Sequence, residues 1–468
     1  MSESADPDPR RAQFDPRRPV DRELELTVGA GFTLIAVGDC ILSRPVSQLR
    51  SARPAFAALL DVLAAGTAVY GNLETVLLDP GRCDGAPHAW RGDWPLSCDP
   101  AVAHDLRSMG FHLLSRANNH ALDWGPEGMR ETTRLLDAHG LTHAGTGETL
   151  ALARRAQFRE TPQGRVGLVS CTTTFRETTD GLNQREAAPG RPGVSGLALK
   201  RFLSVPDQLF GQLAAVRQQL AADGIADLLL EIEPHGGAQA TYRYEMHPGQ
   251  LAEILKQVRQ GKQFADFMVV ALHSHEALTT PDPGQPIWAP PLPATFVSEF
   301  GRRAIDAGAD AVIVTGVHHL GPIEIYRRRP ILTGLGNFFW SDVQTPLAAD
   351  IYESARGALK EAFGYPERAT DADLTLLMNH PYFTHEENFL GAVAEMRFDP
   401  TGLRELILHP VDLGYGDPLS LSGLPRLAGR ERARLIFDRL SAISAPNGIE
   451  LSIQGEAAHA TTLAEVLI

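Results

Sequence analysis

Short apolar runs that end abruptly in polar side chains are the feature that most constrains the fold of this chain. In the clearest example, the run 111–114 indicates a buried strand and leads to Asn118, Asn119 and His120. A hydrophobic core disfavours such a cluster, because burying unpaired polar groups is costly. Apolar residues at helical spacing over 126–139 then predict a helix. A strand, a polar loop and a helix in this order are typical of α/β proteins, which bind ligands at strand ends.

The same pattern recurs at five predicted strand ends. Apolar runs at 32–38, 68–70, 111–114, 267–272 and 311–314 are followed by Asp39, Glu74, Asn119 with His120, His273 and His318, respectively. Strands that alternate with helices form a parallel sheet whose carboxyl ends share one edge, so residues distant in sequence can meet there. A single buried aspartate or histidine is usually a structural group. Five such clusters together indicate a functional site, because buried carboxylates and imidazoles without partners are expensive.

The chain is long enough to bury one large core. It has 468 residues, of which 43% are hydrophobic and 21% are charged. Residues 1–28 are rich in proline, aspartate and arginine without periodicity, which predicts a disordered tail. We expect residues 29–468 to form a single domain with an insertion around 175–262, whose role the sequence does not reveal.

Charge and hydropathy exclude two classes of function. The formal net charge of -14 argues against a nucleic-acid partner, which requires a basic surface to displace phosphate counterions. No window approaches 18 apolar residues, and the N-terminus lacks the apolar segment of a secretory signal. We therefore predict a cytoplasmic protein without membrane insertion.

Six short motifs carry a resemblance to a known family. They are G-D-C-I-L-S-R, N-L-E-T, A-N-N-H-A-L-D-W-G, H-S-H-E, G-P-I-E-I-Y-R-R-R-P-I and L-G-N-F-F. In this order they resemble the CapA family, the poly-γ-glutamate capsule synthesis group, from Phe32 to beyond Asp412. The resemblance implies an α/β fold, a four-layer α/β/β/α sandwich similar to the metallo-dependent phosphatases of the calcineurin-like group.

The resemblance also implies a site that can hold one or two divalent metals, Mn, Fe or Zn. The implied ligands are Asp39, Glu74, Asn119, His273 and His318. His120 would be a proton donor or an anion stabiliser. Carboxylate, amide oxygen and imidazole suit these ions, and two such ions can clamp a phosphoryl or carbonyl group.

This sequence departs from the family pattern at one ligand. The family's typical G-H-x-P-H would supply two histidines, and counting back from the Ile323–Glu324 pair aligns His318 with the second of them and Thr315 with the first. A threonine hydroxyl is a poor ligand for a transition metal. His319 could replace it only if the local backbone is rearranged. We therefore expect an incomplete metal site and favour an enzyme without a cofactor.

A CapA-like shell with an incomplete metal site resembles the lasso-peptide epimerases, an offshoot of the family that inverts a Cα centre without a metal. This resemblance implies that Asp39 and His318 form an acid/base pair on opposite faces of a bound residue. Asn119 and His120 would donate hydrogen bonds to the enolate oxygen. The favoured hypothesis is thus a peptide epimerase, an isomerase that acts on a peptide substrate with a leader segment.

Two other classes of function remain open. The same residues could form a metal-dependent hydrolase of a phosphoester or a polyglutamate-like polymer. The chain could also be a non-enzymatic accessory protein of capsule polymer synthesis. Metal content and deuterium exchange at a peptide Cα separate these hypotheses.

Several further residues are candidates for substrate binding or support. Arg44 could bind a carboxylate or phosphate through its fork of donors, and Trp90 and Trp94 in a long loop could form a peptide-docking surface. We expect Asn337 to support a loop. We expect residues 380–387 to form a solvated loop, although they include histidines and glutamates.

Overall fold

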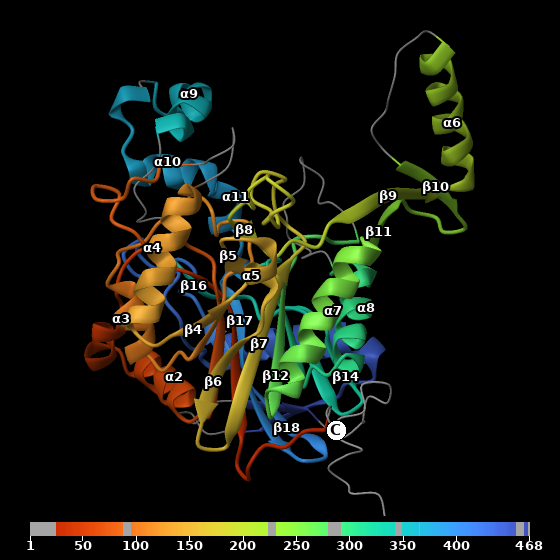
Figure 1. Ribbon diagram of the computed structural model, residues 1–468. Coiled ribbons are helices and arrows are strands. Elements are labelled where there is room, and N and C mark those ends of the chain that lie inside the picture. The colour runs from red at the N-terminus through yellow and green to blue at the C-terminus, as the bar shows by residue number, and fades with distance from the viewer. Residues whose placement is uncertain are drawn as a thin grey trace, which may run out of the picture.

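Two β-sheets packed face to face, with helices on both outer faces, form the body of the protein (Figure 1). The computed structural model describes residues 25–87, 95–222, 231–278, 292–341, 349–364, 366–454 and 463–466. The first sheet has the order β20 (Leu451–Gln454), β21 (Leu463–Val466), β18 (Gly402–Asp412), β17 (Leu390–Asp399), β1 (Thr33–Ile41), β2 (Ala68–Leu73), β3 (Leu113–Ser115) and β4 (Thr142–Ala144), with β16 (Asn337–Trp340) paired to β1 and β19 (Arg426–Leu427) paired to β18. The second has the order β14 (Ile323–Tyr326), β15 (Arg329–Leu332), β13 (Ala311–Thr315), β12 (Phe267–His273), β7 (Gly164–Thr172) and β6 (Gln157–Thr161).

Three hydrophobic clusters join the layers. The central cluster lies between the sheets and includes Leu34 and Tyr70 from the first sheet and Leu168 and Val269 from the second. The outer face of the first sheet is covered by α2 (Pro54–Ala64), α3 (Val102–Ser108) and α4 (Gly125–Ala138). The outer face of the second is covered by α7 (Pro248–Gln263) and α8 (Thr295–Asp306). The expected four-layer α/β/β/α sandwich is therefore confirmed.

Local sequence explains why the central elements form. Strand β12 is apolar from Phe267 to Leu272 and buried on both faces, as expected for a parallel strand between two layers. Helix α2 has Pro54 in its first turn and buries Phe56, Leu59 and Leu63 at helical spacing. The helix predicted at 126–139 is confirmed as α4, and Gly140 follows it with a left-handed φ of 64°.

Parallel pairing brings the polar strand ends together. Strands β1, β2 and β3 are parallel, and so are β12 and β13. In register, Asp39 lies opposite Asn72, and His273 lies opposite Thr315. The edge predicted from the sequence is thus formed by both sheets.

Two additions lie at the end of the sandwich that is uppermost in Figure 1. An arm projects from the body and consists of β9 (Leu199–Pro206), α6 (Asp207–Ala222), β10 (Glu231–His235) and β11 (Thr241–Met246). The other addition, which we call the cap, consists of α9 (Ala349–Phe363), α10 (Asp371–Met378) and α11 (His380–Phe383). No helix in the described part of the chain is long and apolar enough to span a lipid bilayer.

Two predicted boundaries need correction. Leu26 and Val28 are buried in the central cluster, so residues 25–28 belong to the folded body and not to a disordered tail. Their apolar side chains alternate with polar ones, a pattern that the boundary at 28 overlooked. The expected insertion at 175–262 includes α7, but α7 packs in the body, and the projecting arm comprises only 199–246.

One partly buried histidine makes the stability of this body pH-dependent. Nδ1 of His112 accepts a hydrogen bond from the backbone N–H of Val69 at 3.2 Å. Burial, aided by the charges of Arg159 and Arg107, lowers the pKa of His112 from 6.5 to about 4. Because the folded pKa is depressed, the stabilisation is complete above pH 6.5 and is lost as the pH falls from 6.5 towards 4.

We expect the free energy of unfolding to fall by at most about 1.4 kcal/mol per pH unit in this window on account of His112, reduced by solvent screening of its partly exposed ring. The His112→Asn protein should show a shallower slope in urea unfolding at pH 7.5, 6 and 5. His104→Asn, at an exposed position on α3, is the matched control. Equal slopes for the wild type and His112→Asn would contradict this assignment.

Candidate functional site

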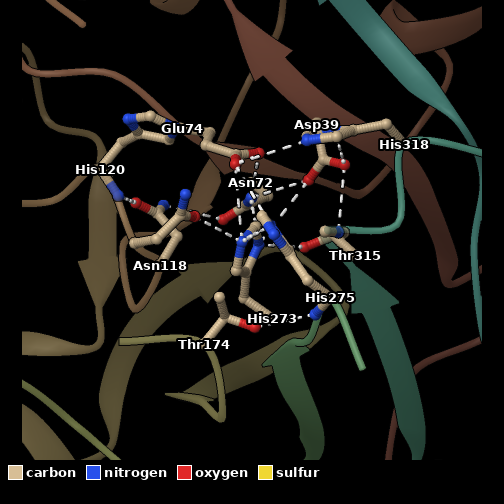
Figure 2. A network of polar contacts seen from close by, with 12 residues as sticks. Asp39, Asn72, Glu74, Asn118, His120, Thr174, His273, His275, Thr315 and His318 are labelled. Atoms are coloured by element: carbon tan, nitrogen blue, oxygen red, sulfur yellow. Dashed lines mark hydrogen bonds and ion pairs between the residues drawn. The ribbon is translucent and has the colours of Figure 1, made fainter. Parts of the chain in front are cut away.

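A pair of buried carboxylates occupies the centre of the polar edge. Asp39 lies near the end of strand β1 and is 1% exposed, and Glu74 follows β2 directly and is 0% exposed. Asn72 lies between them, and its Nδ2 donates to Asp39 Oδ1 at 2.8 Å and to Glu74 Oε2 at 3.4 Å. Figure 2 shows both carboxylates turned towards a group of imidazole rings. Asn72 therefore fixes the spacing of the pair.

The surroundings shift the pKa values of the two carboxyl groups in opposite directions. Burial raises the pKa of Asp39, but the hydrogen bond and charge of His318, with smaller contributions from His273 and Asn72, outweigh it and lower the pKa below its ordinary value. Burial and the charge of Asp39 raise the pKa of Glu74 well above its ordinary value. The two shifts favour an ionised Asp39 and oppose the ionisation of Glu74 in the absence of a cation. Among the described residues, Glu74 Oε1 has no hydrogen-bond partner although it is buried.

His273, at the end of β12, faces the pair with a neutral ring. Its Nε2 lies 2.8 Å from Asn119 Oδ1 and 3.5 Å from Glu74 Oε1. Its Nδ1 lies 3.2 Å from both Asn72 Nδ2 and Thr315 Oγ1. Burial, with the charges of His318 and His120, lowers the pKa of His273 to about 3, although Asp39 opposes the shift. A neutral imidazole of this kind offers a lone pair to a cation.

His318 reaches the pair from the other side in a strained backbone conformation. Its φ is 57°, in the left-handed region that residues with a Cβ rarely adopt. Nδ1 lies 3.1 Å from Asp39 Oδ2 and 3.0 Å from Asn337 Oδ1, and Nε2 lies 3.9 Å from Glu74 Oε1. Asn337, which the sequence assigned to loop support, thus contacts a candidate catalytic group directly.

The double-asparagine turn holds the edge together. Asn118 Nδ2 donates to Asn72 Oδ1 at 3.2 Å and to the carbonyl of Leu73 at 2.8 Å. His120 Nδ1 lies 2.6 Å from Asp123 Oδ2, which also accepts from the backbone N–H of Leu96. Asn118 is therefore a positioning residue, and Asp123 orients the ring of His120.

Sequence reasoning missed three residues of this site. Asn72 and His275 lie within the quoted motifs N-L-E-T and H-S-H-E. The sequence therefore placed both residues near the strand ends, but it did not show that their side chains point into the site. The third is Tyr382 in α11, whose ring lies 6.4 Å from the rings of His318 and His319 and 4.2 Å from that of Trp340. The prediction of a solvated loop at 380–387 is wrong here, because aromatic packing on Trp340 draws this segment onto the site.

The rearrangement that would let His319 replace the ligand missing at Thr315 is not seen in the structure. The Thr315 hydroxyl contacts Nδ1 of His273. His319 is 4% exposed, its ring is parallel to that of Tyr382 within 11°, and it belongs to neither of the histidine–carboxylate groups found among the described residues. Burial lowers the pKa of His319 to about 3. His319 is thus a packing residue and does not replace the ligand missing at Thr315.

The proposed substrate-binding side chains divide into three cases. Asn119 lies in the network through its contact with His273. Arg44 donates from Nη2 to the carbonyl of Ser420 at 2.6 Å and makes no described contact with the carboxylate pair. Trp90 and Trp94 lie outside the described residues.

The donor atoms form two overlapping groups that fit divalent ions. One contains Asp39, Glu74 and His273, and the other contains Glu74, His275 and His318, with all donor atoms of a group within 4.8 Å of one another. Glu74 belongs to both, and its buried Oε1 has no hydrogen-bond partner among the described residues. Carboxylate and imidazole donors in this arrangement suit Mn, Fe or Zn. The residues present therefore fit the metals that the resemblance implies.

Comparisons with known proteins agree with this picture. Residues 33–341 match the family described as bacterial capsule synthesis protein PGA_cap. The uncharacterized protein y4sH of Sinorhizobium fredii is 38% identical over 460 residues, which are 95% of this chain and 96% of that protein. A probable polyglutamine synthesis accessory protein of Mycobacterium tuberculosis is 26% identical over 57% of this chain and 53% of its own length. The PGA biosynthesis protein CapA of Bacillus subtilis is 23% identical over 64% of this chain and 61% of its own. The chain belongs to the CapA family of bacterial capsule synthesis proteins.

Proposed function

We propose that this protein is a metal-dependent hydrolase that cleaves a phosphoester or an amide bond of a polyglutamate-like polymer. The observation that carries the proposal is the environment of Glu74 Oε1. Among the described residues this buried atom has no hydrogen-bond partner, and the Nε2 atoms of His273 and His318 lie 3.5 and 3.9 Å from it. A buried acceptor is normally satisfied, so an unpartnered carboxyl oxygen beside two imidazole nitrogens points to a cation as its partner.

Asp39, Glu74, His273 and His318 would hold the ions, with Asn119 Oδ1 beside them. Ions of this kind, when bound, polarise a phosphoryl or carbonyl oxygen and lower the pKa of coordinated water. Relatives named for polyglutamine and PGA synthesis support an amide-linked polymer as one substrate class. The accessory role in their names is the non-enzymatic alternative.

The protein's own groups supply orientation and proton transfer. Asn72 holds Asp39 Oδ1, and the backbone N–H of Gly316 donates to Asp39 Oδ2 at 3.1 Å, so the carboxylate cannot rotate. His120 is oriented by Asp123, which occupies its Nδ1. Nε2 of His120 therefore donates a proton to the leaving group.

Epimerisation without a metal is less well supported by this geometry. Two bases that invert a Cα centre must stand on opposite faces of the bound residue. Asp39 Oδ2 and His318 Nδ1 are instead 3.1 Å apart, at hydrogen-bonding distance, which leaves no space for a carbon atom between them.

Removal and return of metal tests the proposal. We expect purified protein to contain Mn, Fe or Zn by mass spectrometry, and its hydrolysis of a nitrophenyl phosphodiester or of poly-γ-glutamate to stop after treatment with a chelator. Return of the metal should restore the rate. Activity that is insensitive to the chelator, together with deuterium uptake at a peptide Cα in D2O, would overturn the proposal in favour of epimerisation. Metal-loaded protein that hydrolyses neither substrate class would favour the accessory role.

A further inference from the structure

His275 is the histidine of this site that no motif assigned. It lies two residues beyond the end of β12, and its side chain is 35% exposed, whereas that of His273 is completely buried. Nε2 of His275 lies 3.0 Å from Nε2 of His273 and 4.0 Å from Glu74 Oε1. Its ring centroid lies 5.5 Å from that of His318. Figure 2 shows this ring directed into the same space as the rings of His273 and His318.

The loop around His275 is built to hold the ring in this place. The backbone N–H of His275 donates to Thr174 Oγ1 at 2.8 Å. The carboxylate of the next residue, Glu276, accepts from Thr173 Oγ1 at 2.6 Å and from Ser274 Oγ at 2.8 Å. These bonds fix the loop to the end of β7, so the direction of the His275 ring is preorganised.

The opposite wall is shaped to leave room for the ring. Gly316 has a φ of 106°, and a Cβ there would lie 2.9 Å from Cδ2 of His275. Both the close approach and the backbone conformation require glycine. The space for the His275 ring therefore depends both on the loop that carries His275 and on the glycine at position 316.

An ordinary hydrogen bond does not account for the approach of the two imidazoles. In the metal-free protein, the donor Asn72 Nδ2 faces Nδ1 of His273, and this contact favours the tautomer with its single proton on Nε2, which a bound ion would displace. Asn119 Oδ1 accepts that proton at 2.8 Å. The lone pair of His275 Nε2, 3.0 Å from His273 Nε2, thus has no hydrogen-bond donor of its own. Among the described residues, Glu74 Oε1 lacks a donor as well.

The donor atoms lie at separations near those between the ligands of a metal ion. Two ligands at 2.0–2.1 Å from a metal are separated by about 2.8–3.4 Å in octahedral or tetrahedral geometry. The Nε2 atoms of His273 and His275, 3.0 Å apart, fall in this range. Glu74 Oε1 lies 3.5, 3.9 and 4.0 Å from the three imidazole nitrogens, so these side chains must move closer together to bind an ion.

We propose that His275 is a metal ligand, which completes with Glu74 and His318 a second, solvent-facing metal position beside the buried position of Asp39, Glu74 and His273. The inference rests on the proposed metal dependence and specifies where exchangeable metal and substrate meet. The exposed fractions of the His275 and His318 side chains, 35% and 19%, make this position the one that solvent and substrate reach. Thr315, whose hydroxyl is directed to His273, contributes nothing to it.

Titration of the metal-stripped protein with Mn²⁺ or Zn²⁺ tests the role of His275. We expect the His275→Ala and His275→Gln proteins to bind the more weakly held ion at least about 10-fold less tightly than the wild type in calorimetry. His275→Asp, which supplies a carboxylate, should recover part of the affinity. His104→Ala is the control, and melting of the metal-free proteins shows whether each variant is folded.

Failure of the two proposals can be told apart in the same experiment. Folded wild-type protein that binds neither ion overturns the proposed function and this inference with it. Wild-type protein that binds metal with an affinity unchanged in folded His275→Gln overturns only the role of His275. Loss of affinity in His275→Gln with recovery in His275→Asp supports it.

Discussion

Replacement of Glu74 by glutamine is expected to reduce metal-dependent hydrolysis by at least about 1000-fold, since a bound ion supplies several kcal/mol of transition-state stabilisation. Glu74 is the only residue shared by the two donor groups among the described residues, so its loss affects both positions. A glutamine side chain has the same shape but cannot supply a negative charge to a cation.

The same substitution should leave the metal-free protein as stable as the wild type, or more stable. Burial and the charge of Asp39 raise the pKa of Glu74 well above its ordinary value, so ionisation of this carboxyl is costly in the metal-free protein. An amide of equal size cannot ionise and therefore removes this repulsion as the pH rises.

Activity assays and urea unfolding of the stripped proteins check both halves of this prediction. Glu148→Gln, which changes an exposed carboxylate paired with Arg130, is the matched control and should retain the wild-type rate. A Glu74→Gln protein that keeps full activity and full metal content would show that the carboxylate is structural.

Substitution of Gly38 by alanine is expected to destabilise the protein by at least about 3 kcal/mol and to disrupt the site. A Cβ at Gly38 would lie 1.7 Å from the carbonyl oxygen of Gly336, which is backbone and cannot move aside as a side chain does. That same oxygen accepts the backbone N–H of Asp39 at 3.2 Å. The next residues, Asp39 and Asn337, are register partners of β1 and β16, so any separation of the strands moves both.

Chemical denaturation of Gly38→Ala measures this cost. Gly211→Ala is a sharp control, because Gly211 lies in helix α6 with no atom near the position of a Cβ. There the substitution should be neutral or stabilise the helix by about 0.5–1 kcal/mol. A Gly38→Ala protein as stable as the wild type would mean that β16 does not approach β1 as described.

The shared edge could be predicted from the residues because each strand end is a local pattern, whereas the four layers were expected from the resemblance to the CapA family. Asp39, Asn119, His273 and His318 each follow an apolar run, and parallel pairing alone brings such residues together. The direction of side chains beyond the strands depends on loop conformation, which the sequence expresses weakly. His275 and Asn72 were missed for this reason, although both lie in the motifs that revealed the family.

Long-range packing explains the remaining differences. Tyr382 comes from a segment without strand or motif, and only its contacts with Trp340 and His319 place it beside the site. His318 likewise combines a left-handed backbone conformation with ring contacts to Asp39 and Asn337, neither of which is its neighbour in the sequence. Interactions between residues far apart in the chain cannot be deduced from periodicity.

The way the arm is attached has a consequence for the evolution of this architecture. Its first and last strand residues, Leu199 and Met246, are paired across one rung of the ladder, and the backbone N–H of His247 closes the entrance by donating to the carbonyl of Ala198 at 2.9 Å. Helix α6 buries no residue against the layers below. The chain thus leaves and re-enters the body at adjacent residues. Insertions, exchanges or deletions in the arm can therefore occur during evolution without altering the polar edge of the sandwich.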